Sequence, residues 1–273
     1  MMRVDAAGGD AALAAIDAAT TAPGFPPGPH TVSNNGEDIA PLPKAPNGGD
    51  ADVAGRPKEL SPAGAATEKA LAAAADAVVK VAAELDEIDK QVGDGDCGST
   101  VALAAEAVAA DLKTKYPLNS ASGTMAQVAL SVKKAVGGTS GALYAVFFSS
   151  AAGSLKKSAG DGDATPAQWA AALQAGADGV SFYGGAKGGS RTMLDAILPA
   201  AAAAMEAANA GKGAAEVAAA AAAAAHKGAD ATKGMAPSAG RSSYVPAEVT
   251  AKCPDPGAVA VATWMTAIAD TLA

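Results

Sequence analysis

The sequence predicts an all-α protein, and three observations lead to that prediction. Alanine supplies 78 of the 273 residues, about 29%, and alanine is the best helix former because it loses no side-chain entropy in a helix. Aromatic residues make up only 4% of the chain, whereas a β-sandwich or β-barrel needs many aromatic and β-branched runs. Finally, glycine-rich loops separate stretches in which apolar residues recur at helical spacing.

The first 61 residues differ from the rest of the chain. Residues 11–19 suit one short helix, whereas residues 23–61 contain Pro-Pro, Asn-Asn-Gly and Asn-Gly-Gly clusters with almost no apolar periodicity. This composition is typical of a flexible linker, and we expect most of it to be disordered. Because long structureless loops are rare inside compact domains, we interpret the short helix as the end of another domain.

From Pro62 onward the sequence predicts eight helices. A capping residue followed by proline marks two of the starts, at Thr165-Pro166 and at Asp255-Pro256. The nearly pure alanine run 218–225 predicts a close-packed helix in the interior of the bundle. The expected helices span approximately residues 62–90, 99–113, 122–136, 140–157, 166–183, 192–210, 214–228 and 256–272.

Composition also argues against several classes of protein. With 20 basic and 28 acidic residues the formal net charge is −8, whereas a nucleic-acid binder needs a basic face. Two cysteines, Cys97 and Cys253, are too few for a disulfide framework and indicate free thiols in a reducing compartment. Neither a membrane span nor a signal peptide is recognisable. The sequence therefore predicts a cytoplasmic protein that binds neither nucleic acid nor membrane.

The loop after the first expected helix holds three carboxylates, Asp89, Asp94 and Asp96, within eight residues. Carboxylates gathered in one place repel one another unless a cation or protons intervene. Hard oxygen ligands on a short loop suit Mg²⁺, which also contacts substrate phosphates. The sequence therefore predicts a magnesium site, and a solvated acidic turn with capping aspartates is the plainer alternative.

Two other motifs overlap this loop and are rejected. The spacing Gly93-x-Gly95-x-x-Gly98 matches a dinucleotide fingerprint, but that fingerprint must follow a strand, and here a helix precedes it. An EF-hand loop that starts at Asp94 needs glutamate at its twelfth position, where this chain has Ala105.

Three further loops open helices and suit anions, because the amides at a helix start are free to bind them. They are Gly137–Gly141 with two hydroxyl groups, Gly184–Met193 with Arg191, and Pro254–Gly257. The guanidinium of Arg191 can fork onto phosphate oxygens. Taken singly, each loop is equally consistent with a helix that ends at glycine or with an ordinary helix cap, and Asp255 is most simply an N-cap.

Two familiar kinds of site are missing from the sequence. No Gly-x-x-x-x-Gly-Lys-Ser/Thr motif occurs, so this is not a P-loop protein. With only His30 and His226, histidine-based triads and histidine-rich metal sites are nearly excluded. An acidic loop for metal and several loops for phosphate indicate phosphoryl transfer, in which catalysis is positioning plus charge neutralisation.

In this order the loops resemble the nucleotide-binding L domain, also called the DAK2-type or DhaL domain, of dihydroxyacetone kinases. The resemblance spans about residues 62–273. Its Cys97-Gly-Ser-Thr100 motif is most similar to that of the single-chain, ATP-dependent eukaryotic type. The segments that carry it are Asp89-x4-Asp94-Gly-Asp96-Cys-Gly-Ser-Thr, Gly137-Gly-Thr-Ser-Gly-Ala-Leu-Tyr144, Arg191-Thr-Met-Leu-Asp195, Gly240-Arg-Ser-Ser-Tyr244 and Asp255-Pro-Gly-Ala258.

The resemblance implies a barrel of eight antiparallel helices with ATP and two Mg²⁺ ions at one end. It implies that Asp89, Asp94 and Asp96 hold the metal ions. One departure is that Gly188-Gly189-Ser190 stands where the family usually has Pro-Gly-Asp, so that one acidic contact is lost. The residues implied around the nucleotide are Cys97, Gly98, Ser99, Thr100, Gly138, Thr139, Ser140, Arg191, Asp255, Pro256 and Gly257.

The resemblance also implies a division of the chain and a partner. Residues 1–22 look like the end of a K domain, the substrate-binding domain of these kinases, residues 23–61 are the linker, and residues 62–273 are the DhaL domain. We therefore expect a glycerone kinase that transfers the ATP γ-phosphate to dihydroxyacetone, or glyceraldehyde, held by a K domain in trans. FAD-AMP lyase activity, which forms cyclic FMN, and a degenerate nucleotide- or partner-binding module are the alternatives, and a homodimer is left open.

Overall fold

The structure is a computed structural model that describes residues 55–273, so the expectations for residues 1–22 and 23–54 lie outside the described residues. Its short elements are η2 (Thr232–Gly234), η3 (Arg241–Tyr244) and α9 (Ala247–Thr250). The described part contains no strand, and the eight expected helices are confirmed as α2 (Pro62–Val92), α3 (Cys97–Leu112), α4 (Ala121–Ala135), α5 (Gly138–Ala159), α6 (Pro166–Gly184), α7 (Leu194–Asn209), α8 (Ala214–Ala231) and α10 (Pro256–Leu272).

Local capping fixes several helix starts. The Ser61 hydroxyl accepts a hydrogen bond from the Gly64 amide at 2.9 Å, one residue before α2. Thr165 and Gln168 form a reciprocal capping box at the start of α6. The Asp255 carboxylate caps α10 through the Ala258 amide. These side chains satisfy amides that have no acceptor inside the helix, and the two starts predicted from cap and proline pairs are confirmed.

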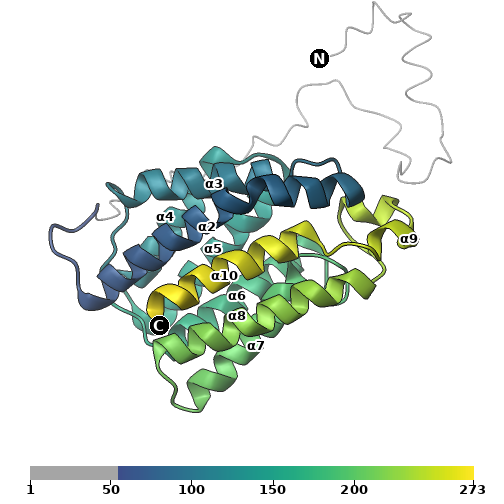
Figure 1. Cartoon of the computed structure of the whole chain (residues 1–273). Coiled ribbons are helices and arrows are strands. Elements are labelled where there is room, and N and C mark those ends of the chain that lie inside the picture. The colour runs from purple at the N-terminus through teal and green to yellow at the C-terminus, as the bar shows by residue number, and fades with distance from the viewer. Residues whose placement is uncertain (1–54) are drawn as a thin grey trace, which may run out of the picture. The chain divides into compact units, whose positions relative to one another are not determined.

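The eight long helices close into a ring. Each helix from α2 to α8 packs against the next one in the chain, and α10 packs against both α8 and α2. Figure 1 shows α10, in yellow, between α2 and α8. Helices joined by short loops run antiparallel, so the barrel of eight antiparallel helices is confirmed. The loops that follow α2, α4, α6 and α8 therefore meet at one end of the barrel.

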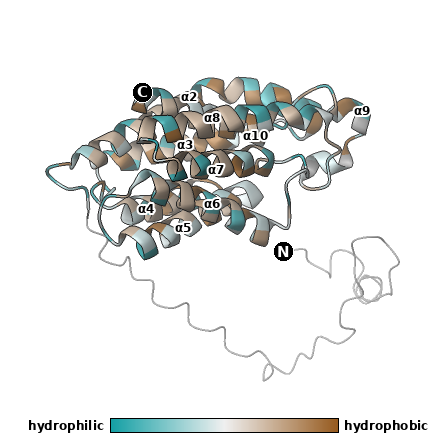
Figure 2. Cartoon of the chain, turned by 90° about the horizontal axis from the view of Figure 1, so that it is seen from below, coloured by the Kyte–Doolittle hydropathy of each residue, from teal (hydrophilic) through white to brown (hydrophobic). Residues whose placement is uncertain are grey.

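The alanine-rich helix α8 corrects one expectation. It buries a single face, which includes Val217, Ala221 and Ala225, whereas Ala219 and Ala223 are exposed. The expectation that the 218–225 run lies inside the bundle is therefore wrong, because a helix in a one-layer barrel turns only one side to the interior. Figure 2 shows hydrophilic and hydrophobic residues mixed along the helices of the barrel.

The helices of the barrel line an apolar cavity of about 420 Å³ that is partly open to solvent. Alanine side chains from most of the helices line it together with a few large rings, among them Tyr144, Phe147, Trp169 and Trp264. Small side chains explain its presence, because alanine reaches only a short way from a helix into the space between the walls. The cavity extends from the first turns of α2 to residues near the loop end described above.

Residues 56–61, at the end of the predicted linker, contact the barrel. Arg56 forms an ion pair with Glu68 at 2.7 Å and donates to the Leu112 carbonyl. The Asn119 side chain donates to the Glu59 carbonyl and accepts from the Ser61 amide. This short segment is therefore held against α2 and the end of α3.

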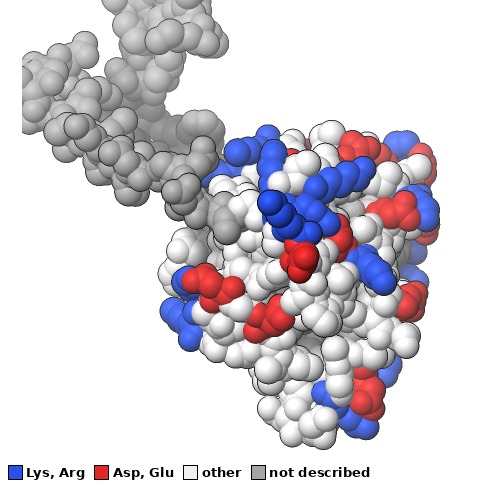
Figure 3. Space-filling model, turned by 90° about the vertical axis from the view of Figure 1, so that its left-hand side faces the viewer, with Lys and Arg blue, Asp and Glu red and all other residues white. Residues whose placement is uncertain are grey.

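The surface of the domain carries charges of both signs. On the face drawn in Figure 3, Lys and Arg side chains lie among Asp and Glu side chains and leave wide uncharged areas between them. Among the helices that the structure describes, none has both the length and the apolarity required of a membrane span.

Candidate functional site

Asp89 organises the acidic loop. It lies in the last turn of α2 with 8% of its surface exposed. Its Oδ2 atom accepts three amide hydrogen bonds, from Gly95 at 2.9 Å, Asp96 at 3.0 Å and Cys97 at 3.2 Å. The chain after α2 is thereby wrapped around one carboxylate oxygen. Gly95 makes the turn possible, because its φ of +80° is a conformation that side-chain-bearing residues rarely adopt.

Asp94 and Asp96 complete the cluster, and both are exposed. Each of the three aspartates contributes one carboxylate oxygen, and these atoms lie within 4.8 Å of one another. Three hard anionic oxygens at this separation match the ligand preference of Mg²⁺, which keeps several waters besides its protein ligands. The donor set of the folded chain therefore fits the metal that the sequence predicts.

The first turn of α3 begins two residues earlier than predicted, because α2 supplies acceptors for its amides. Asp86 accepts from the Ser99 amide at 2.9 Å and from the Ser99 hydroxyl at 2.6 Å, while Asp89 takes the Cys97 amide. Two groups predicted to face phosphate are thus already bound to carboxylates. Gly98 lets the helices meet, since a Cβ atom there would lie 1.8 Å from the Ala82 carbonyl oxygen.

The thiol of Cys97 is held in its neutral form. Burial, and after it the charges of Asp255 and Asp89, raises the pKa of Cys97 to about 12. Since the nucleophilic form of cysteine is the thiolate, Cys97 is unsuited to covalent chemistry at neutral pH. It can still contact a ligand as a small apolar side chain.

The second loop opens α5. The helix begins at Gly138, which has a φ of +66°, and the exposed Thr139 and Ser140 lie in its first turn. The amides of a first turn have no acceptors within their helix. A groove of about 620 Å³ runs beside this turn between α4 and α6, with Lys133, Gly138 and Tyr183 among its lining residues. Sequence reasoning missed this groove, since its walls come from three helices.

The third loop is organised by Asp195, which sequence reasoning did not single out for a role. Its two carboxylate oxygens accept hydrogen bonds from the amides of Gly189 and Thr192. Only 5% of Asp195 is exposed. Its place in the Arg191-Thr-Met-Leu-Asp195 segment was the available signal, because an acidic residue in the first turn of a helix satisfies amides there.

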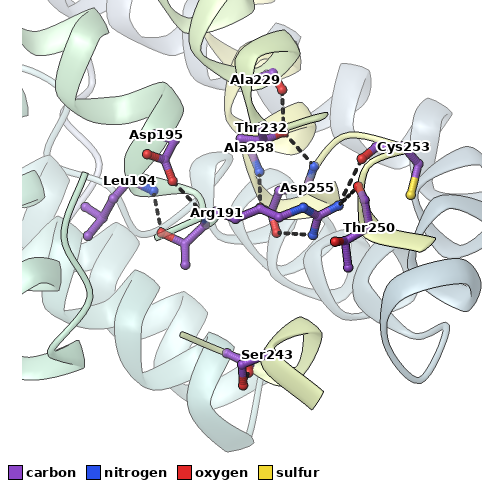
Figure 4. A network of polar contacts seen from close by, with 12 residues as sticks. Arg191, Leu194, Asp195, Ala229, Thr232, Ser243, Thr250, Cys253, Asp255 and Ala258 are labelled. Atoms are coloured by element: carbon purple, nitrogen blue, oxygen red, sulfur yellow. Dashed lines mark hydrogen bonds and ion pairs between the residues drawn. The ribbon is translucent and has the colours of Figure 1, made fainter. Parts of the chain in front are cut away.

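Arg191 points into the protein. Its side chain is fully buried, and Nη2 donates to the carbonyls of Thr250 at 3.2 Å and Cys253 at 2.9 Å. Nη1 lies 4.0 Å from the Asp255 carboxylate. Figure 4 shows the guanidinium crossing from the start of α7 to the segment that precedes α10. Arg191 thus reaches the segment that leads into the fourth loop. There Nη2 donates to two protein carbonyls, while Nε and Nη1 have no hydrogen-bond partner among the described residues.

The fourth loop is organised by Asp255. Besides capping α10, this residue donates its amide to the Thr232 hydroxyl at 2.8 Å. Burial raises the pKa of Asp255 to about 6, and the charges of Asp195 and Asp89 act in the same direction, whereas the Ala258 amide and Arg191 oppose it. Pro256 and Gly257 follow in the first turn of the helix.

The raised pKa predicts a pH dependence of stability without ligand. Because folded Asp255 holds its proton more tightly than the unfolded chain, stability is greatest below the unfolded value of 3.8 and falls as pH rises through about 6. The expected loss is of the order of 2–3 kcal/mol. Asp255→Asn keeps a capping oxygen but cannot ionise, so urea unfolding at pH 4 and pH 7 should show a smaller decrease for this variant than for the original chain. Equal decreases would contradict the assignment.

The four loops converge at one end of the barrel. The charges of Asp255 and Asp89 both act on Cys97, and the charge of Asp255 also acts on the phenol of Tyr144. Asp89, Cys97 and Asp255 therefore lie close together, although 166 positions separate the first from the last. Tyr144, a residue in the second predicted loop segment, lines the apolar cavity as well.

Comparison with known proteins identifies the family. A family model described as the DAK2 domain matches residues 91–270. The chain belongs to the DAK2 domain family. This confirms the resemblance drawn from the loop segments, and the matched range contains Asp94, Asp96 and the three later loops.

Several relatives of this DAK2 chain have names. A Solanum lycopersicum protein named "Putative 3,4-dihydroxy-2-butanone kinase" is 43% identical over 95% of this chain and 43% of its own length. The mouse protein named triokinase/FMN cyclase is 35% identical over 78% of this chain and 37% of its own length. A crystal structure of Citrobacter freundii dihydroxyacetone kinase with AMP-PNP and Mg²⁺ is similar with a TM-score of 0.62 and 29% identity, over 81% of this chain and 35% of that one. The DAK2 chain therefore spans less than half of each of these relatives.

Proposed function

We propose that this DAK2 chain binds ATP with Mg²⁺ and transfers the γ-phosphate to dihydroxyacetone, or glyceraldehyde, held by a K domain in trans. The observation that carries the proposal is the meeting of three carboxylate oxygens within 4.8 Å with three loops that open helices at the same end of the barrel. Phosphoryl transfer depends on such positioning and charge neutralisation. The relative from Citrobacter freundii was crystallised with AMP-PNP and Mg²⁺, which supports the choice of ligand.

Asp89, Asp94 and Asp96 are the proposed ligands for two Mg²⁺ ions, which when bound neutralise charge on the phosphates. Asp89 also fixes the loop backbone, so it orients the other two aspartates. The proposed contacts of the nucleotide are the segment Cys97–Thr100, the helix start at Gly138–Ser140 and the turn Asp255–Gly257. The Cys97 and Ser99 amides bond to carboxylates, and the Thr100 amide bonds to the Asp96 carbonyl. The backbone of this segment is therefore already held, and we assign its proposed contacts with phosphate to its side chains.

Calorimetric titration tests the binding half of the proposal. The full chain is expected to bind ATP in the presence of Mg²⁺ and to bind it at least about tenfold more weakly in EDTA, a difference of about 1.4 kcal/mol. Adding the K domain of a dihydroxyacetone kinase with dihydroxyacetone should then produce ADP in a coupled assay. Binding without any dependence on Mg²⁺ would overturn the metal site, and binding without transfer would favour the degenerate module.

A second activity has support from relatives, since the mouse and human proteins are named triokinase/FMN cyclase. In FAD-AMP lyase activity a free ribityl hydroxyl of FAD attacks the phosphorus of the phosphate on the same ribityl chain. The bond between this phosphate and AMP breaks, AMP leaves and cyclic FMN remains. Chromatography of FAD incubated with the chain and Mg²⁺ decides this alternative, because release of AMP with cyclic FMN is specific to it.

The remaining parts of the proposal concern the protein's surroundings. The K domain is the proposed partner because the named relatives are more than twice as long as this chain, and a homodimer is the second possibility that a sizing column tests. The cytoplasm is the proposed location. Both cysteines of the described part are free thiols, as a reducing compartment allows.

A further inference from the structure

Arg191 has an exceptional backbone and an exceptional environment. It is the one non-glycine residue with a positive φ, +61°, in the part of the chain that the structure describes. Its side chain is also the largest that is fully buried there. A strained backbone persists only where the surrounding contacts determine it, and a buried guanidinium must be matched by acceptors. Both features indicate that the surrounding contacts keep this side chain in place despite its strained backbone.

The acceptors of Arg191 all belong to the segment that leads into α10. One nitrogen, Nη2, donates to two main-chain carbonyls, those of Thr250 and Cys253, and Nη1 faces the Asp255 carboxylate at 4.0 Å (Figure 4). Nε and Nη1 have no hydrogen-bond partner among the described residues. The planar guanidinium therefore faces three residues of the segment 250–255, two through the hydrogen bonds of Nη2 and one through Nη1, an arrangement that a lysine ammonium on a flexible stem does not reproduce.

The backbone around Arg191 is fixed from the opposite side. Asp195 accepts the amides of Gly189 and Thr192, which flank the arginine, and the Ser190 carbonyl accepts from the Ser238 amide at 3.2 Å. The third loop is thus anchored to α7 by its backbone. It is joined to the connection between α8 and α10 by the Ser190 carbonyl and by the Arg191 side chain, which supplies the hydrogen bonds to the segment just before the fourth loop.

We propose that Arg191 is a positioning residue, which sets the Asp255-Pro256-Gly257 turn against the nucleotide through the Thr250 and Cys253 carbonyls and does not itself bind phosphate. This inference rests on the proposed nucleotide site for its functional meaning. The structural part of the inference can be tested without nucleotide, because it states that the segment before α10 becomes less ordered when the guanidinium is removed.

Hydrogen exchange without nucleotide tests the structural content. Arg191→Lys keeps the charge and the same backbone cost but loses the fork. In this variant the amides of residues 250–259 are expected to exchange at least about tenfold faster, because local opening then needs fewer broken contacts. The amides of α4 on the far wall serve as the internal reference and should not change. Unchanged exchange at 250–259, or equal loss of protection in α4, would overturn the proposal.

Nucleotide binding tests the functional content. If Arg191 only positions the turn, Arg191→Lys and Arg191→Met should weaken Mg²⁺-dependent ATP binding and AMP binding by the same factor. If it binds the outer phosphates, ATP binding should weaken while AMP binding is retained, and the proposal is wrong. The control is Lys113→Met, which removes an exposed cation at the end of α3, at the opposite end of the barrel, and should leave both affinities unchanged. A parent chain that binds no Mg-ATP would refute the proposed function, while the exchange experiment would still decide the role of Arg191.

Discussion

Asp94→Asn is expected to abolish most Mg²⁺-dependent ATP binding while leaving the fold intact. Asp94 is exposed and supplies one of the three clustered oxygens, so its replacement removes a ligand without opening the core. We expect affinity to fall by at least about a hundredfold, because even partners outside the ligand shell of a metal contribute 10–100-fold. Calorimetry with ATP and saturating Mg²⁺ measures the change.

Two further substitutions make this result interpretable. Asp76→Asn, at an exposed position of α2, is the matched control and should bind ATP as the original chain does. Asp89→Asn should lose binding and also cost about 1–3 kcal/mol in urea unfolding, because the Asp89 carboxylate holds three amides of the loop. Full binding by Asp94→Asn would refute the metal site, and equal stability losses in Asp89→Asn and Asp94→Asn would refute the distinct role given to Asp89.

Gly98→Ala is expected to be the most damaging single-methyl change in the described part of the chain. A Cβ atom at this position would lie 1.8 Å from the Ala82 carbonyl oxygen and 2.9 Å from Oδ1 of Asp86. The start of α3 would have to retreat from α2, which separates Ser99 from Asp86. The expected cost is about 3 kcal/mol, at the upper end for overpacking, and urea unfolding measures it.

The control for this change is the same substitution in an open place. Gly153 lies inside α5 and is exposed, and a Cβ atom added there would have no neighbouring atom within 4 Å. Gly153→Ala should therefore stabilise the protein by about 0.5–1 kcal/mol, because alanine restricts the unfolded chain and favours the helix. If Gly98→Ala were as well tolerated as Gly153→Ala, the close contact between α2 and α3 would be wrong.

The sequence predicted the parts of this fold that local chemistry decides. Thr165 and Asp255 cap helices followed at once by proline, and both starts were found correctly because cap and proline act within three residues. The start of α3 was placed too late, since Cys97 and Ser99 enter the helix by donating to carboxylates on another one. The barrel order came from the resemblance, because spacing along one helix does not specify its neighbours.

In the candidate site, too, the sequence predicted the features set by local spacing and missed those set by tertiary contacts. The acidic cluster was predictable, because three aspartates within eight residues must lie close together wherever the loop goes. The direction of the Arg191 side chain was not, because the same residue on a glycine-rich loop can point to a ligand or into the protein. Asp195 was overlooked for a related reason: its acceptor role depends on amides that only the folded loop brings to it.

The apolar cavity inside the barrel has a consequence for the response of this domain to compression. Its volume of about 420 Å³ belongs to the folded state alone, because the extended chain has no packed walls that surround such a space. Unfolding removes the part of this space that water does not fill, and hydrostatic pressure favours the state of smaller total volume. A wall of thin, alanine-rich helices around such a space makes the domain more sensitive to pressure than a tightly filled bundle of the same length.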